Sequence, residues 1–366
     1  MTSSTEGRKE GAARLDNFDA LRTVACWAVV ILHAAAIFYH DAAPKSFAWG
    51  TAEFLKCAAT MAVPCFVMAS GYFILGKLAN DENFSAKEYY RRRVSKLAAP
   101  LIFWNVMCFA KGWGLARLAG REDLGFSWTN FWERGTLAGE YLWFLPMLLG
   151  LYLVAPLLAS AVKNFSSGAL AGIAFAWAAL NAGNWALLGE IQECEPTKTF
   201  LVVWQYYIPY FLLGKALGDL AQEIPPKSRL AFASIYILAT CAAFASKLEA
   251  INVGPLGYYS FVGTVQSTAF YMWILSSKKT NDVGSWQTKV ARWTAPASFG
   301  VYLAHPFALT VVKEVARIVA GDAIFSPSAS ILVAATTILG ASVVAFFMSV
   351  ATVWVFRKIP GLRRVV

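Results

Sequence analysis

Four ionisable residues lie on one face of an apolar segment near the start of the chain. The segment is NFDALRTVACWAVVILHAAAIFYH, residues 17–40, and the four residues are Asp19, Arg22, His33 and His40. At about 100° and about 1.5 Å per residue, a helix places Arg22 and His33 on one stripe roughly 16 Å apart, with His40 on the same stripe. Asp19 lies one turn before Arg22. The stripe therefore combines a guanidinium that binds anions with an imidazole that moves protons near neutrality.

Each of these residues also has a purely structural interpretation. His33 fits a buried neutral histidine bonded to a backbone carbonyl, and Arg22 with Asp19 fits an ion pair at the membrane interface. His40 fits an interfacial position at the far end of the helix. Because ionisable groups inside a membrane helix are costly, the alignment favours a functional role, with His33 as a general base.

Two further groups of residues have the right chemistry for a site. The run Arg91, Arg92, Arg93 and Lys96 fits a cytoplasmic positive cluster, and it fits a phosphate site equally well. His305 precedes Pro306, which breaks the hydrogen bonding of a helix and exposes backbone groups. A core histidine and a site residue are both compatible with that position.

These residues must be positioned by membrane helices. The chain has 366 residues, of which 58% are hydrophobic and 15% charged, and its mean hydropathy is +0.50. Apolar runs of spanning length predict an all-α, polytopic bundle of about ten transmembrane helices. The predicted spans are 18–40, 52–76, 94–115, 141–161, 168–188, 200–221, 229–246, 256–277, 294–318 and 328–356.

The distribution of basic residues predicts the topology. Most of the 32 Lys and Arg residues fall in cytoplasmic segments if the N-terminus is inside, so both termini are expected to be cytoplasmic. Residues 1–16 and 357–366 are then cytoplasmic tails around a membrane domain at 17–356. The polar N-terminus lacks the apolar core of a cleavable signal, so the first span is expected to direct insertion.

Composition argues against two other classes of function. The net charge of +10 is distributed in short segments between apolar runs, which argues against nucleic-acid binding. Five of the six cysteines lie inside apolar segments, and the three histidines form no metal-binding spacing. We therefore expect no disulfide framework and no metal site.

Six sequence motifs, taken in order, resemble the membrane acyltransferase-3 family. The first is Arg22, ten residues, then His33. The others are AVPCFVMASGYFIL (62–75), YRRRVSKLAAPLIFWN (90–105), YLWFLPMLLGLYLVAPLL (141–158), YYIPYFLLGKALG (206–218) and SFGVYLAHPF (298–307). Two positions depart from the family pattern: Arg93-x-x-Lys96 replaces Arg-x-x-Arg, and Tyr141 replaces a histidine before Leu-Trp-Phe.

The resemblance implies an O-acyltransferase of the bacterial inner membrane, similar to stand-alone members that acetylate enterobacterial common antigen. It implies acetyl-CoA as the donor and a surface polysaccharide or its lipid-linked precursor as the acceptor, in contact with membrane lipids. His33, Arg22 and Asp19 would be catalytic, and Arg92, Arg93 and Lys96 would bind the donor's phosphates.

An acceptor glycan would use rings for stacking and polar groups for hydrogen bonds. The candidates for that contact are Glu140, Trp143, Tyr206, Tyr207 and His305. Structural interpretations stay open here too, because Glu140 fits a loop carboxylate and the aromatic residues fit packing or an interfacial belt.

Two rival functions remain at this point. A secondary transporter or flippase for a sugar or small acid also needs buried charges among many helices, although no inverted repeat is visible. A non-catalytic partner in polysaccharide synthesis is the other rival. The sequence leaves open which glycan is the acceptor and how long the acyl group is. It also leaves open whether transfer is direct or passes through a covalent acyl-enzyme, and whether the protein forms a homo-oligomer.

Overall fold

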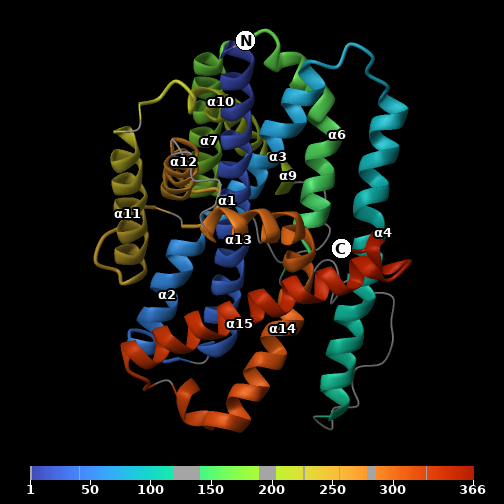
Figure 1. The fold of residues 1–366 in the computed structure, drawn as a ribbon. Coiled ribbons are helices and arrows are strands. Elements are labelled where there is room, and N and C mark those ends of the chain that lie inside the picture. Colours follow the sequence, from blue (N-terminus) through green and yellow to red (C-terminus); the bar gives the residue numbers. More distant parts are fainter. Residues whose placement is uncertain are drawn as a thin grey trace.

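The first helix, α1 (Thr2–Phe38), runs through the middle of the molecule and contacts helices on all sides (Figure 1). The computed structural model describes residues 2–40, 42–118, 141–188, 203–225, 227–254, 256–277, 286–326 and 328–366. Within these ranges the regular structure is entirely helical, which confirms the predicted all-α class.

The helices follow the predicted apolar runs. After α1 come α2 (Phe47–Ala59), α3 (Ala62–Ala79), α4 (Ala86–Leu118), α6 (Phe144–Val162), α7 (Ser167–Leu188), α9 (Trp204–Tyr206), α10 (Ile208–Leu220), α11 (Ser228–Lys247), α12 (Phe261–Leu275), α13 (Trp286–Thr294), α14 (Ser298–Ala320) and α15 (Ile331–Lys358). Short 3-10 turns occur at η3 (Ala295–Ala297), η4 (Asp322–Phe325) and η5 (Leu362–Arg364).

Six stretches of the described residues are long and apolar enough to cross a membrane. They are Asp16–Phe38, Phe47–Ala79, Phe144–Val162, Ser228–Lys247, Trp286–Ala320 and Ile331–Lys358. These helices indicate a membrane protein. The number of ten spans and the cytoplasmic location of both termini stay predictions. One predicted span, 52–76, consists of two helices, because the chain breaks between α2 and α3 at Thr60 and Met61.

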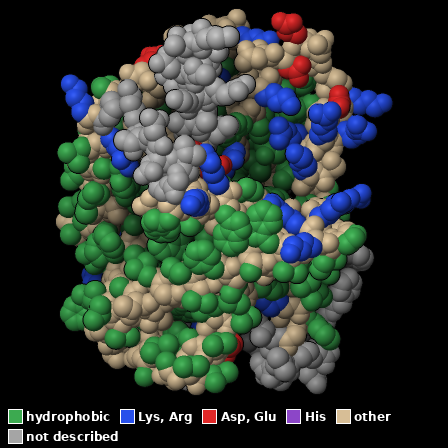
Figure 2. Space-filling model, viewed as in Figure 1, with side chains coloured by type: hydrophobic (Ala, Val, Ile, Leu, Met, Phe, Trp, Pro, Cys, Tyr) green, Lys and Arg blue, Asp and Glu red, His purple; other side chains and the backbone are tan. Residues whose placement is uncertain are grey.

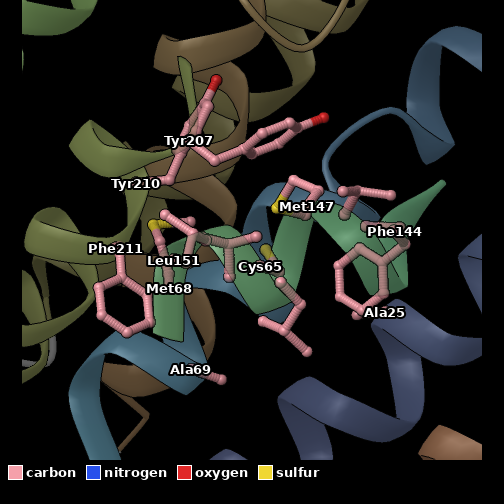
Figure 3. Close-up of a cluster of buried hydrophobic side chains, with 14 of the residues drawn as sticks. Ala25, Cys65, Met68, Ala69, Phe144, Met147, Leu151, Tyr207, Tyr210 and Phe211 are labelled. Carbon is pink, nitrogen blue, oxygen red and sulfur yellow. The ribbon is translucent and has the colours of Figure 1, made fainter. Parts of the chain in front are cut away.

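Helix α1 lies between two hydrophobic clusters. Phe18, Leu21 and Ala25 pack into the larger one, with α3, α6, α10 and α12, whereas Val30 and Ala34 pack into the smaller one, with α14 and α15. Figure 3 shows side chains of the larger cluster, including Ala25, Cys65, Phe144 and Phe211. Because these two faces are buried, the remaining stripe of α1 is fixed in direction and carries Arg22 and His33.

Small residues let α3 and α10 approach each other closely. A Cβ atom at Gly214 would stand 1.9 Å from the Met68 backbone oxygen, and one at Gly71 would stand 1.9 Å from the Phe211 oxygen. Such backbone contact is typical of helix pairs in membranes, where dispersion forces and not water drive association.

We predict that Gly214→Ala destabilises the protein by about 3 kcal/mol or more, because backbone atoms of α3 cannot move aside as a flexible side chain would. The matched control is Gly172→Ala in α7, where an added Cβ meets nothing within 4 Å. This control should be neutral or stabilising by up to about 1 kcal/mol. Unfolding midpoints in detergent measure both, and equal midpoints for the two variants would contradict the close contact.

Candidate active site

Two histidines from distant parts of the chain meet inside the bundle. His33 lies on α1 and His305 on α14, and their ring centroids are 5.0 Å apart with planes inclined by 45°. The sequence marked each residue separately. The structure places them side by side, so that two imidazoles share one site.

Pro306 determines how the His305 ring is oriented. In a helix the carbonyl of Tyr302 would accept a hydrogen bond from residue 306, but proline has no N–H. The free Tyr302 oxygen lies 2.7 Å from His305 Nδ1. Because a carbonyl only accepts, Nδ1 must carry the proton, and Nε2 of the neutral ring is then an acceptor.

The two histidines differ in access. His305 is 0% exposed, and its Nε2 has no hydrogen-bond partner among the described residues. His33 keeps some accessible surface although it lies deep in the bundle. Of the two residues, only His33 therefore has surface for direct contact with a substrate, and His305 could act on a substrate only through its neighbour.

Aromatic rings surround the pair. The Tyr141 ring lies 6.4 Å from the His33 ring and 5.7 Å from the His305 ring, and its hydroxyl contacts Cys108 Sγ at 2.7 Å. The Tyr302 ring lies 6.1 Å from the His305 ring. Tyr141 thus occupies a position next to both imidazoles.

A cavity of about 920 Å³ extends from a basic region toward this pair. Five cations line it, namely Arg22, Arg93, Lys96, Arg363 and Arg364, and its described lining contains no aspartate or glutamate. Figure 2 shows Lys and Arg side chains gathered on the right of the view, over α4 and beside the C-terminal end of the chain. The volume is in the range of small-molecule and cofactor pockets, about 300–1,000 Å³.

Apolar and aromatic residues that neighbour the histidines also line the cavity, although neither histidine is among its lining residues. These neighbours are Val29, Phe144 and Tyr302. Val29 precedes His33 by one turn of α1, and the Phe144 and Tyr302 rings are 5.2 Å apart. A ligand with a charged head and an apolar arm fits this order of lining residues.

Two of the cations are held by aromatic rings. The Arg22 guanidinium lies 4.8 Å from the Phe73 ring centre and 3.8 Å from the Asp19 carboxylate. The Arg93 guanidinium lies 5.5 Å from the Tyr89 ring centre and 5.1 Å from that of Tyr152. The ring contacts fix the position of a cation without neutralising its charge, and Arg22 is in addition ion-paired with Asp19.

Tyr89 is itself fixed by a proline. Its hydroxyl donates to the Tyr152 carbonyl at 3.1 Å, which is free because Pro156, four residues later in α6, has no N–H. Burial raises the pKa of Tyr89 to about 12, so the phenol stays neutral beneath Arg93. Arg93 therefore retains its charge for a ligand.

Arg92 lies apart from this cavity. It forms an ion pair with Glu88 and lines a smaller cavity of about 170 Å³. Arg93 and Lys96 line both cavities, while Arg92 lines only the smaller of the two. The donor-binding role predicted for Arg92 thus has no support from the larger cavity.

Three of the five predicted acceptor residues, Trp143, Tyr206 and Tyr207, lie in a separate aromatic cluster, whereas His305 lies beside His33. The Trp143 and Tyr207 ring centroids are 6.0 Å apart, and Tyr206 lies 4.9 Å from Tyr259. Tyr207 is 0% exposed and packs the cluster, whereas Trp143 and Tyr206 are half-buried. Glu140 lies outside the described residues.

Two further sequence-based expectations concern the position of His40 and the binding of metal ions. His40 is exposed just after α1 ends, and its position at the membrane interface stays a prediction. In the part of the chain that the structure describes, no group of His, Cys, Asp or Glu could hold a metal ion.

A family model described as an acyltransferase domain, acyltransferase-3, matches residues 15–356. The chain belongs to the acyltransferase-3 family. No curated protein and no solved structure matches the chain. The match confirms the family that the six motifs of this acyltransferase indicated. It also extends past the last motif, into α15.

Sequence reasoning missed several residues of the acyltransferase site. In the sequence, Tyr141 is recognisable only as a departure from the family pattern, and Cys108 is one of the five cysteines inside apolar segments. Arg363 and Arg364 were assigned to a cytoplasmic tail, yet they line the cavity. The one signal for the histidine geometry was the His-Pro pair at 305 and 306.

We predict that Pro306→Ala lowers acyltransferase activity by roughly 10-fold to 100-fold, the range seen when a partner that orients a functional histidine is lost. The alanine N–H would compete with His305 Nδ1 for the Tyr302 carbonyl, while the helix itself gains a hydrogen bond. The unfolding midpoint should stay equal or rise, and histidine ¹⁵N shifts should report a mixed tautomer. Unchanged activity with a more stable helix would show that the tautomer is irrelevant.

Proposed function

We propose that this acyltransferase is an O-acetyltransferase of the bacterial inner membrane, with both termini cytoplasmic. It moves an acetyl group from cytoplasmic acetyl-CoA to a hydroxyl of a surface polysaccharide or its lipid-linked precursor. The observation that carries the proposal is the cavity, which is lined by five cations and, nearer the histidines, by Val29 and Tyr302. Val29 lies one turn before His33 on α1, and the Tyr302 ring lies 6.1 Å from the His305 ring.

The donor fits the cavity with its nucleotide head among the cations. Phosphates are bound by guanidinium groups through charge-assisted hydrogen bonds, and Arg93 is presented by Tyr89 and Tyr152 for such a contact. The pantetheine arm then follows α1 from Arg22 past Val29. Its thioester reaches the level of His33, one turn farther along the helix.

The acceptor is bound at the aromatic cluster. Trp143 and Tyr206 keep accessible ring surface that can stack on a sugar, and Tyr207 supports them from within the core. The chain segment that carries Trp143 also carries Tyr141 and Phe144, which contact the histidines and the cavity. This continuity links the acceptor to the reaction centre.

The reaction is a direct transfer in which His33 is the general base. His33 removes the proton of the acceptor hydroxyl, the oxygen attacks the thioester carbonyl carbon, and the C–S bond breaks. The leaving CoA thiolate takes up the proton from His33. His305 is a positioning residue, because its Nε2 lone pair can accept a hydrogen bond from the His33 imidazolium.

We predict that His33→Ala and His33→Gln both lower acetyl transfer by about 10²–10⁴-fold, the usual contribution of a general base. Glutamine keeps volume and hydrogen bonding but cannot accept a proton. Transfer of radiolabelled acetyl groups to the lipid-linked glycan fraction in membranes measures the effect, normalised to protein level.

Donor binding provides the control for this experiment. Affinity for CoA should be almost unchanged in both variants, because the nucleotide head is bound at the other end of the cavity. Wild-type transfer by His33→Gln would end the catalytic assignment and leave His33 as a structural residue.

A second prediction separates two adjacent arginines. Arg93→Gln should weaken CoA binding by about 1.5–3 kcal/mol, or roughly 10-fold to 150-fold, through loss of a charge-assisted contact. Arg92→Gln is the matched control and should bind CoA as the wild type does. Isothermal titration of CoA measures both, and equal losses would show that only net positive charge matters.

A further inference from the structure

The last residues of the chain fold back onto the bundle. Helix α15 ends at Lys358, and the backbone turns at Gly361, whose φ of +96° is rarely adopted by other residues. The 3-10 turn η5 follows, and Trp104 Nε1 on α4 donates to the Val365 carbonyl at 2.8 Å. This segment, 357–366, is therefore held in place by a buried tryptophan.

Two arginines of this turn become part of the cavity. Arg363 and Arg364 line it together with Arg93 and Lys96 of α4. Both side chains are exposed, and neither forms an ion pair within the described part of the chain. Two unpaired cations on an anchored turn are suited to bind an anion that enters the cavity from the solvent.

The five cations that line the cavity differ in how exposed their side chains are. Arg22 and Arg93 are half-buried and already lie over aromatic rings, whereas Lys96, Arg363 and Arg364 are exposed and mark the mouth. In CoA the diphosphate is joined directly to the pantetheine arm, while the 3′-phosphate lies farther out on the ribose. A donor that enters arm first keeps its 3′-phosphate at the mouth.

We propose that Arg363 and Arg364 form the binding site for the 3′-phosphate of the donor's nucleotide head. The proposal rests on the proposed function, because it assumes a CoA thioester in this cavity. A phosphate monoester carries about −1.5 to −2 charges near neutrality, more than either phosphate of a diester-like linkage. Two adjacent guanidinium groups match that charge and its oxygen acceptors.

The test compares CoA with 3′-dephospho-CoA as ligands of the purified full-length protein in nanodiscs of neutral lipid. The variants are Arg363→Gln, Arg364→Gln and, as a control, Lys358→Gln, which removes an exposed cation of the same segment outside the cavity lining. Each arginine variant should weaken CoA binding by about 10-fold or more. Binding of 3′-dephospho-CoA should change by less than about 2-fold, and the control should match the wild type.

A conservative variant guards against misfolding. The double change Arg363→Lys with Arg364→Lys keeps both charges, so it should retain most of the preference for CoA over 3′-dephospho-CoA. All variants should unfold at the wild-type midpoint. The Trp104 hydrogen bond that anchors the turn is made to the Val365 backbone, which these substitutions do not change.

Two outcomes would overturn the proposal, and they are distinguishable. If the wild type binds CoA and the arginine variants bind it equally well, or lose both ligands to the same extent, the 3′-phosphate site is wrong while the proposed function stands. If the wild type binds neither ligand, the donor assignment itself fails and the site fails with it.

Discussion

The hydrogen bond from His305 Nδ1 to the Tyr302 carbonyl is the interaction on which the site depends. In an apolar bundle, a polar group without a partner costs several kcal/mol, so an imidazole must find an acceptor inside the protein. Pro306 provides one by removing the N–H that would otherwise occupy that carbonyl. The same device recurs in α6, where Pro156 leaves the Tyr152 carbonyl free for the Tyr89 hydroxyl. One proline thus orients a histidine in the candidate active site, and another orients the ring under Arg93.

Packing determines which face of α1 is available for chemistry. Residues such as Leu21 and Val30 belong to different hydrophobic clusters, so the helix is covered on two sides. The third side carries Arg22 and Val29 into the cavity and His33 toward His305. The close contact of α3 with α10 at Gly71 and Gly214 makes the scaffold around α1 rigid. A rigid frame keeps the distance between the cations and the imidazoles constant, as the proposed binding of a flexible donor arm between them requires.

Local properties of the sequence predicted the helices well. Length and hydropathy located apolar helices, and the period of the helix placed Arg22 and His33 on one stripe. The sequence did not predict which face of α4 packs against the bundle, so Arg92 and Arg93 could not be told apart. The packing of α4 against α6 places Arg93 over the Tyr152 ring and leaves Arg92 exposed, beside Glu88 of its own helix. The meeting of His33 with His305, and the return of Arg363 to the cavity, are contacts between distant segments. No local pattern encodes such contacts.

In the proposed reaction, the acyl donor lies along the cavity with its thioester at His33. A cryo-EM map of the protein with a non-hydrolysable acetyl-CoA analogue tests it most directly. We expect the nucleotide beside Arg93 and the acetyl carbonyl carbon next to the His33 ring. An acceptor oxygen should fit between them at a near-attack distance of about 3–3.5 Å from that carbon. An analogue bound with its acetyl group away from both histidines, or outside the cavity lined by Arg22 and Arg93, would contradict it.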